Sequence, residues 1–163
     1  MGITTKRKAA LTALRERTPP AGTTSWRAAK SLLRLLSQVD SNWPTRKKAS
    51  DGTVGDASHQ TRDSDHNPWV KDGAVGVVTA IDITHDPAGG CDAESVVEAL
   101  RSSRDRRIKY IIWNKRIVSA TVSAWMWRPY AGSNPHTKHF HLSVSANKTL
   151  YDSQDDWEVI SSA

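Results

Sequence analysis

The chain has 163 residues, enough for one domain with a sizeable core, and a formal net charge of +6. Its lone cysteine, Cys91, excludes an internal disulfide. No apolar run reaches the roughly 18 residues of a membrane-spanning helix, so we expect no membrane insertion.

The positive charge favours a polyanionic partner, either an anionic bacterial cell wall or a nucleic acid. Basic residues are scattered, with local clusters at residues 6–8, 46–48 and 104–109. No helix-turn-helix, finger or other nucleic-acid module accompanies these clusters, so we expect no nucleic-acid partner. We interpret the cluster at 46–48 as solvent-exposed surface.

The first predicted elements are helical. A short helix over residues 8–17 and a Pro- and Gly-containing linker form a basic N-terminal segment, residues 1–24. A second helix is expected from Ser25, a suitable N-cap, to about Val39, because apolar residues recur at helical spacing. Residues 46–65 are polar and predict a loop or weak strand leading to His66.

The middle of the chain alternates apolar and polar residues, as a half-buried strand does. Ile81 and Ile83 belong to one apolar face, which leaves Asp82 on the opposite face. Before this strand, residues 67–73 contain a proline and an Asp-Gly pair, and they predict a turn-rich insertion.

The remaining elements complete an α+β domain. A helix capped by Asp92 is expected to end near residue 104, followed by a hairpin of residues 108–113 and 116–121 that turns at Asn114-Lys115. An aromatic loop over residues 125–135 leads to a final strand at 139–144. We therefore expect a small antiparallel sheet with helices packed on one face and a functional site on the other. This domain spans residues 25–146, and residues 147–163 form a tail.

Histidines mark the functional site. All six lie between residues 59 and 141. In the final strand His139 and His141 project to one face, while Phe140 lies on the other. Together with Asp82 they offer histidine and carboxylate groups on one sheet face, a combination typical of catalytic zinc with an open position for water. A lone H-x-H also occurs on exposed strands without any function, so the prediction depends on the other motifs.

Three motifs in fixed order, Ser64-x-His66, Ala80-x-Asp82 and His139-x-His141, resemble the signature of a zinc peptidase family. This LAS-type (hedgehog-like) family includes D-alanyl-D-alanine carboxypeptidases and dipeptidases, penicillin-insensitive murein endopeptidases and phage L-alanyl-D-glutamate endolysins. The resemblance covers about residues 25–146 and implies one zinc ion held by His66, Asp82 and His141. The surrounding sequence is most similar to actinobacteriophage lysin peptidase domains.

The spacing H-x-x-H-x-H, from residue 136 to residue 141, resembles the murein endopeptidase branch, in which the two earlier histidines line the active site. We assign His139 as a proton shuttle or transition-state stabiliser, and His136 as a second histidine of the relay or a substrate contact. Their roles can be exchanged. Residues 127–141 contain no Asp or Glu, so the carboxylate that the family usually places there is absent.

The sequence departs from the family between the first histidine and the aspartate. Fifteen residues separate His66 from Asp82, more than family members usually have. A loop can lengthen at modest entropic cost without moving its ends, so the ligand set is retained in the prediction.

Other side chains are candidates for substrate binding. Gln60 and Arg62 precede His66 and could bind a substrate carboxylate, although an exposed loop is the alternative. Trp127 and Tyr130 precede the final strand and could form a groove wall, with core packing as the alternative. His59 and His85 are expected at the surface or behind the ligands.

The resemblance implies a zinc-dependent peptidoglycan peptidase that hydrolyses a stem-peptide or cross-link amide bond. We expect a monomer with bacterial peptidoglycan as its partner. The basic N-terminus lacks the apolar segment of a secretory signal, which favours the host cytoplasm until release to the wall, or a virion. A metal-dependent nuclease and a non-catalytic wall-binding or virion structural domain are the alternatives.

Overall fold

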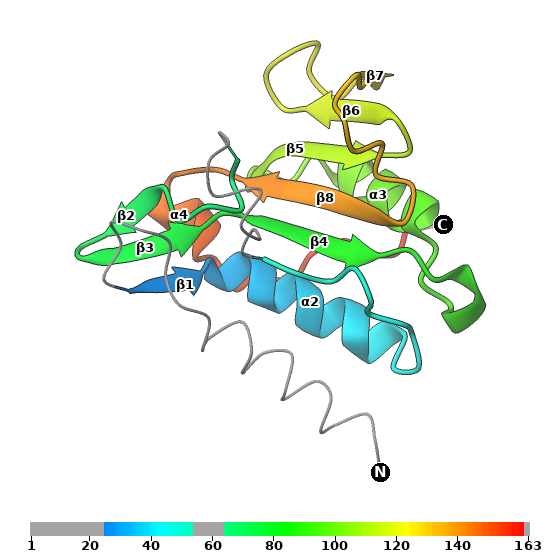
Figure 1. Cartoon of the computed structure of the whole chain (residues 1–163), viewed down its shortest axis with the longest axis horizontal. Coiled ribbons are helices and arrows are strands. Elements are labelled where there is room, and N and C mark those ends of the chain that lie inside the picture. Colours follow the sequence, from blue (N-terminus) through cyan, green and yellow to red (C-terminus); the bar gives the residue numbers. More distant parts are fainter. Residues whose placement is uncertain (1–24, 54–63, 162–163) are drawn as a thin grey trace.

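A computed structural model of the protein describes residues 25–53 and 64–161 (Figure 1). It confirms an α+β fold. The helix expected at residues 8–17 lies outside the described residues, as do His59, Gln60 and Arg62. The elements are, in chain order, β1 (Trp26–Ala28), α2 (Lys30–Asn42), β2 (Val70–Asp72), β3 (Val75–Val78), β4 (Ala80–Thr84), the 3-10 helix η1 (Pro87–Gly89), α3 (Ala93–Ser103), β5 (Ile108–Trp113), β6 (Arg116–Ser119), β7 (Arg128–Pro129), β8 (His139–Val144) and α4 (Lys148–Tyr151).

The larger sheet has five antiparallel strands in the order β4-β8-β5-β6-β7. The predicted final strand at 139–144 is confirmed as β8, which lies between β4 and β5 (Figure 1). The predicted hairpin is confirmed as β5 and β6. Its turn residues Asn114 and Lys115 have φ values of 49° and 63°, the left-handed conformation that a tight two-residue hairpin turn requires.

One face of this sheet builds the core. Ile81 and Ile83 of β4 lie opposite Leu142 and Phe140 of β8, and all four are buried. They share one hydrophobic cluster with residues of both long helices, among them Leu32, Leu35 and Val39 of α2 and Val96, Val97 and Leu100 of α3. Because side chains alternate along a strand, Asp82 and His141 lie on the other face.

The second helix is shorter at its start than the sequence predicts. Residues 26–28 form β1, which pairs in parallel with β3, and α2 begins only at Lys30. Ser25 is therefore not its N-cap. The pairing partners, Gly76–Val78, are distant in the sequence, so the helical spacing of the apolar residues gave no sign of this strand.

The insertion after His66 is a hairpin and not an irregular loop. Its strands β2 and β3 pair in antiparallel fashion and complete a three-stranded sheet with β1. Asp72 in this hairpin accepts hydrogen bonds from Arg27 and Lys148. In Figure 1 the hairpin lies at the opposite end of the molecule from β7, so its tip is remote from the aromatic loop.

The basic cluster at 46–48 is not simply exposed surface. The guanidinium of Arg46 is fully buried and lies 2.9 Å from Asp40 and 3.0 Å from Asp51. The prediction is wrong for this residue because two carboxylates, Asp40 of α2 and Asp51 of the segment after it, satisfy its charge in the interior.

The C-terminal residues pack on the same core. Trp157 and Val159 are buried in the hydrophobic cluster, and the Arg107 guanidinium carbon lies 3.7 Å from the centroid of the Trp157 ring. Among the helices within residues 25–53 and 64–161, none is both long enough and apolar enough to cross a bilayer.

Candidate metal centre

Asp82 and His141 are directly opposite each other on neighbouring strands. They form a cross-strand pair between β4 and β8, and their side chains share the face opposite the core. Asp82 Oδ1 lies 3.2 Å from His141 Nδ1. The alternation of apolar residues on both strands fixes this register, because a shift by one residue would turn Ile83 and Phe140 out of the core.

His66 reaches the pair from outside the sheet. Its Nε2 lies 3.0 Å from His141 Nδ1 and 3.2 Å from Asp82 Oδ1. Its Nδ1 donates a hydrogen bond to the carbonyl oxygen of Thr53 at 2.6 Å. Thr53 follows Gly52, whose backbone pairs with that of Asp82 as an isolated antiparallel bridge. The segment before the undescribed residues 54–63 therefore holds the ring of His66 against β4.

These three side chains fit the donor set of a metal ion. Their ligand atoms form a triangle with edges of 3.0, 3.2 and 3.2 Å. Two ligands placed about 2.0–2.2 Å from a tetrahedral zinc ion lie about 3.3–3.6 Å apart. The triangle is within a few tenths of an ångström of that spacing. His66, Asp82 and His141 are thus a group that could hold a metal ion.

The surrounding hydrogen bonds orient both rings for this role. Because a carbonyl oxygen only accepts, His66 carries its proton on Nδ1, and in the neutral ring Nε2 presents a lone pair to the triangle. His141 Nε2 lies 2.8 Å from the hydroxyl oxygen of Ser143, so Nδ1 is left for the triangle when Nε2 donates. The ring of Tyr110 stacks on His141 at 5.3 Å with an interplanar angle of 9°. Such partners fix the tautomer and the orientation of histidine ligands in metal sites.

The charges of the triangle favour an ionised Asp82 beside a protonated His66. Burial alone would raise the pKa of Asp82, but hydrogen bonds with His141 and His66 outweigh it and lower that pKa. Burial lowers the pKa of His141. Burial would lower the pKa of His66 too, but its hydrogen bond and charge interaction with Asp82 raise it. A proton on His66 can be replaced by a metal cation, which competes for the same lone pair.

Two more histidines adjoin the triangle. His139 Nε2 lies 3.6 Å from Asp82 Oδ2, and the ring centroids of His136 and His139 are 5.0 Å apart. The ring centroid of His136 is 5.8 Å from that of His141. The structure therefore brings together the five side chains that the sequence assigned to metal binding and catalysis.

His136 is held in an unusual backbone conformation. Its φ is 54°, in the left-handed region that few non-glycine residues adopt. The β5–β6 turn fixes it there, because Asn114 N–H donates to the carbonyl of His136 and Lys115 N–H to that of Pro135. His136 Nδ1 also donates to the carbonyl of Asn134 at 2.7 Å. Backbone strain that is held in place this firmly is typical of functional residues.

Of the predicted substrate-binding residues that the structure describes, one lies next to the histidine cluster and the other packs against the core. The Tyr130 ring lies 5.7 Å from that of His136, next to the site. Trp127 packs instead against the core, where the Arg116 guanidinium carbon lies 4.5 Å above its ring. Gln60 and Arg62 lie outside the described residues. Both aromatic residues remain predictions as substrate contacts.

Several residues of the site have no signal in the sequence. Thr53 acts through its carbonyl, which every residue possesses, and Ser143 and Tyr110 have no motif of their own. Asp65 is a further carboxylate beside the site: it pairs with Lys109 at 2.9 Å. His85 accepts a hydrogen bond from the backbone of Ala93, so it supports the start of α3.

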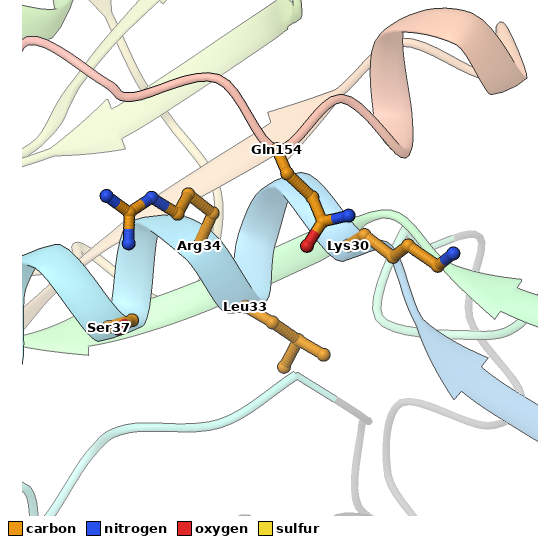
Figure 2. Close-up of a pocket in the computed structure, with 5 residues that line it drawn as sticks. All are labelled: Lys30, Leu33, Arg34, Ser37 and Gln154. Atoms are coloured by element: carbon orange, nitrogen blue, oxygen red, sulfur yellow. The ribbon is translucent and has the colours of Figure 1, made fainter.

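A pocket elsewhere on the surface shares no residue with this cluster. It is lined by four residues of α2 and by Gln154, and Figure 2 shows Leu33 pointing away from Gln154. Arg34 in this pocket pairs with Asp156. Unlike the histidine cluster, the residues that line this pocket include no histidine, cysteine or carboxylate.

Comparison of the chain with protein-family models, with curated proteins and with solved structures finds no match.

Proposed function

We propose that this protein is a zinc-dependent peptidoglycan peptidase that hydrolyses a stem-peptide or cross-link amide bond. The observation that carries the proposal is the triangle of His66, Asp82 and His141, whose ligand atoms are 3.0–3.2 Å apart and oriented by Thr53 and Ser143. Two histidines and a carboxylate leave a position open on zinc, as in catalytic sites.

A bound zinc ion would lower the pKa of a water molecule and polarise the peptide carbonyl. The chain's own residues then supply positioning and proton transfer. His139 faces Asp82 at 3.6 Å and has no hydrogen-bond partner among the described residues, so it is available to move a proton. Burial and the charge of His141 lower the pKa of His136 to about 4. His136 is therefore neutral near pH 7, and because its Nδ1 donates to the Asn134 carbonyl, its Nε2 can accept a hydrogen bond.

The substrate class is inferred from the order and spacing of the motifs. Ser64-x-His66, Ala80-x-Asp82 and the H-x-x-H-x-H spacing resemble peptidases of the bacterial cell wall. The positive charge of the protein supports a nucleic-acid substrate less well than these motifs support a cell-wall substrate. Several basic side chains within the described residues are paired with carboxylates, which reduces the positive charge available to a phosphate backbone, among them Arg27, Arg46, Arg107, Lys109 and Lys148.

The test is a parallel digestion of purified peptidoglycan and of DNA by the zinc-loaded protein, with Asp82→Ala as the inactive reference. We expect soluble peptide-bearing fragments from peptidoglycan, intact DNA and no release by Asp82→Ala. Cleavage of DNA without cleavage of peptidoglycan would show that the protein is a nuclease and not a peptidase. Wall binding without cleavage, unchanged by Asp82→Ala, would indicate a non-catalytic wall-binding domain.

A further inference from the structure

The carboxylate of Asp82 has two sides, and the triangle uses only one of them. Oδ1 faces His66 and His141, whereas Oδ2 faces His139. His136 lies beyond His139, and Asp82, His136 and His139 form a second group whose ligand atoms all lie within 4.8 Å of one another. Asp82 belongs to both groups.

The His139–Asp82 contact is too long for a hydrogen bond but suits a shared ion. His139 Nε2 lies 3.6 Å from Asp82 Oδ2, beyond hydrogen-bonding distance. This distance is at the upper end of the roughly 3.3–3.6 Å that separates two ligands of a tetrahedral zinc ion. Both ring nitrogens of His139 are buried and have no hydrogen-bond partner within residues 25–53 and 64–161. An unsatisfied imidazole facing a carboxylate at this distance is a suitable ligand pair for a cation.

His136 is oriented to complete the group. Its Nδ1 donates to the Asn134 carbonyl, so Nε2 of the neutral ring carries the lone pair. The Asn134 carbonyl fixes the tautomer of His136, as the Thr53 carbonyl does for His66. The left-handed φ of 54° and the contacts with the β5–β6 turn hold this ring in place before any ligand arrives.

We infer that the protein has a second divalent-cation site, formed by His136, His139 and Asp82 Oδ2, and that Asp82 bridges it to the first. A carboxylate that bridges two ions is a recurrent feature of two-metal hydrolytic sites. The second ion binds more weakly, because the first ion repels it and already draws on the negative charge of Asp82. On the proposed function, its binding withdraws His136 and His139 from proton transfer, so it inhibits hydrolysis.

The test is a metal titration that needs no substrate. The full chain is stripped of metal and titrated with Zn²⁺ by isothermal calorimetry, with equilibrium dialysis as a count. We expect two equivalents, the second weaker. His136→Gln and His139→Gln should still bind the first equivalent, but their affinity for the second should fall at least about tenfold. Removal of a residue that only supports a metal ligand already costs about 10–100-fold in affinity, so loss of a ligand itself should cost no less. Retention of the first equivalent also shows that these variants are folded. His85→Gln, a histidine outside both groups, is the matched control and should bind two.

Cobalt(II) tests the bridge directly. With two equivalents of Co²⁺ bound, a shared Asp82 carboxylate should couple the two ions magnetically and weaken the signal per ion in electron paramagnetic resonance. Saturation by one equivalent, two uncoupled ions, or an unchanged second equivalent in both variants would overturn the inference. Because no peptidoglycan is present, these outcomes are independent of whether the protein cleaves it. Failure of the peptidase assay alone would leave the second site intact.

Discussion

His66 Nε2 lies 3.0 Å from His141 Nδ1, and both atoms face Asp82 Oδ1 at 3.2 Å. The hydrogen bond from His66 Nδ1 to Thr53 leaves its Nε2 with a lone pair in the neutral ring. When neither nitrogen carries a proton, the two lone pairs and the carboxylate oxygen repel one another at these distances unless a cation lies between them. A proton meets this need in part, and a divalent metal ion meets it for all three ligands.

Loss of any triangle residue should abolish tight metal binding. Asp82→Ala, His66→Ala and His141→Ala each remove one of three ligands, so elemental analysis after dialysis should find about one zinc per chain in the parent and almost none in the variants. His85→Ala should match the parent. Full zinc retention by Asp82→Ala would mean that the ion lies elsewhere.

Proton transfer should be separable from metal retention. His139→Ala leaves the triangle intact, so the tightly held zinc remains, while hydrolysis slows by roughly two to four orders of magnitude. The measurement is the release of peptidoglycan fragments by protein of known metal content. If His139→Ala lost the tightly held ion, His139 would be a ligand of the first site and its assigned role would be wrong.

The hydroxyl of Ser143 should support metal affinity through His141. Ser143 is fully buried and lies 2.8 Å from His141 Nε2. Ser143→Ala removes this partner and should weaken zinc binding by about 10–100-fold, measured by competition with a chelator. Ser102→Ala, at an exposed position on α3, is the control and should change nothing. Equal affinity in both variants would exclude an orienting role for Ser143.

The buried ion pair of Arg46 should matter far more than a surface pair. Arg46→Ala removes the buried guanidinium that pairs with Asp40 and Asp51 and should lower the free energy of unfolding by about 3–5 kcal/mol. Arg34→Ala breaks the exposed pair with Asp156, whose side chain is 72% exposed, and should cost less than about 1 kcal/mol. Urea unfolding measures both. A loss below 1 kcal/mol for Arg46→Ala would contradict the burial.

Stability of the metal-free protein should fall in acid because of His136. The pKa of this buried residue is about 4, against 6.5 in the unfolded chain, so between these values the unfolded state binds a proton that the folded state does not. Its contribution is lost as the pH falls from about 6.5 to 4, at most about 3 kcal/mol. His136→Gln should lose correspondingly less stability over this range in urea unfolding with a chelator present. Parallel losses in the two proteins would show that His136 is not responsible.

The elements predicted well are those with a local signal. Strand alternation placed His141 and Asp82 on the non-core face, and Asn114-Lys115 marked the hairpin turn. The errors lie where the secondary structure depends on pairing with a segment distant in sequence. Residues 26–28 form β1 because they pair with β3. The support from Thr53 could not be predicted, since a carbonyl hydrogen bond leaves no trace in residue type.

The most direct test is hydrolysis of purified peptidoglycan by the same preparation before metal removal, after it, and after zinc is restored, with fragments identified by mass spectrometry. We expect peptide-bond cleavage that disappears with the metal, returns with one equivalent of zinc and is absent throughout in Asp82→Ala. Peptide-bond cleavage that persists in metal-free protein, or that survives in Asp82→Ala, would contradict a catalytic metal at His66, Asp82 and His141.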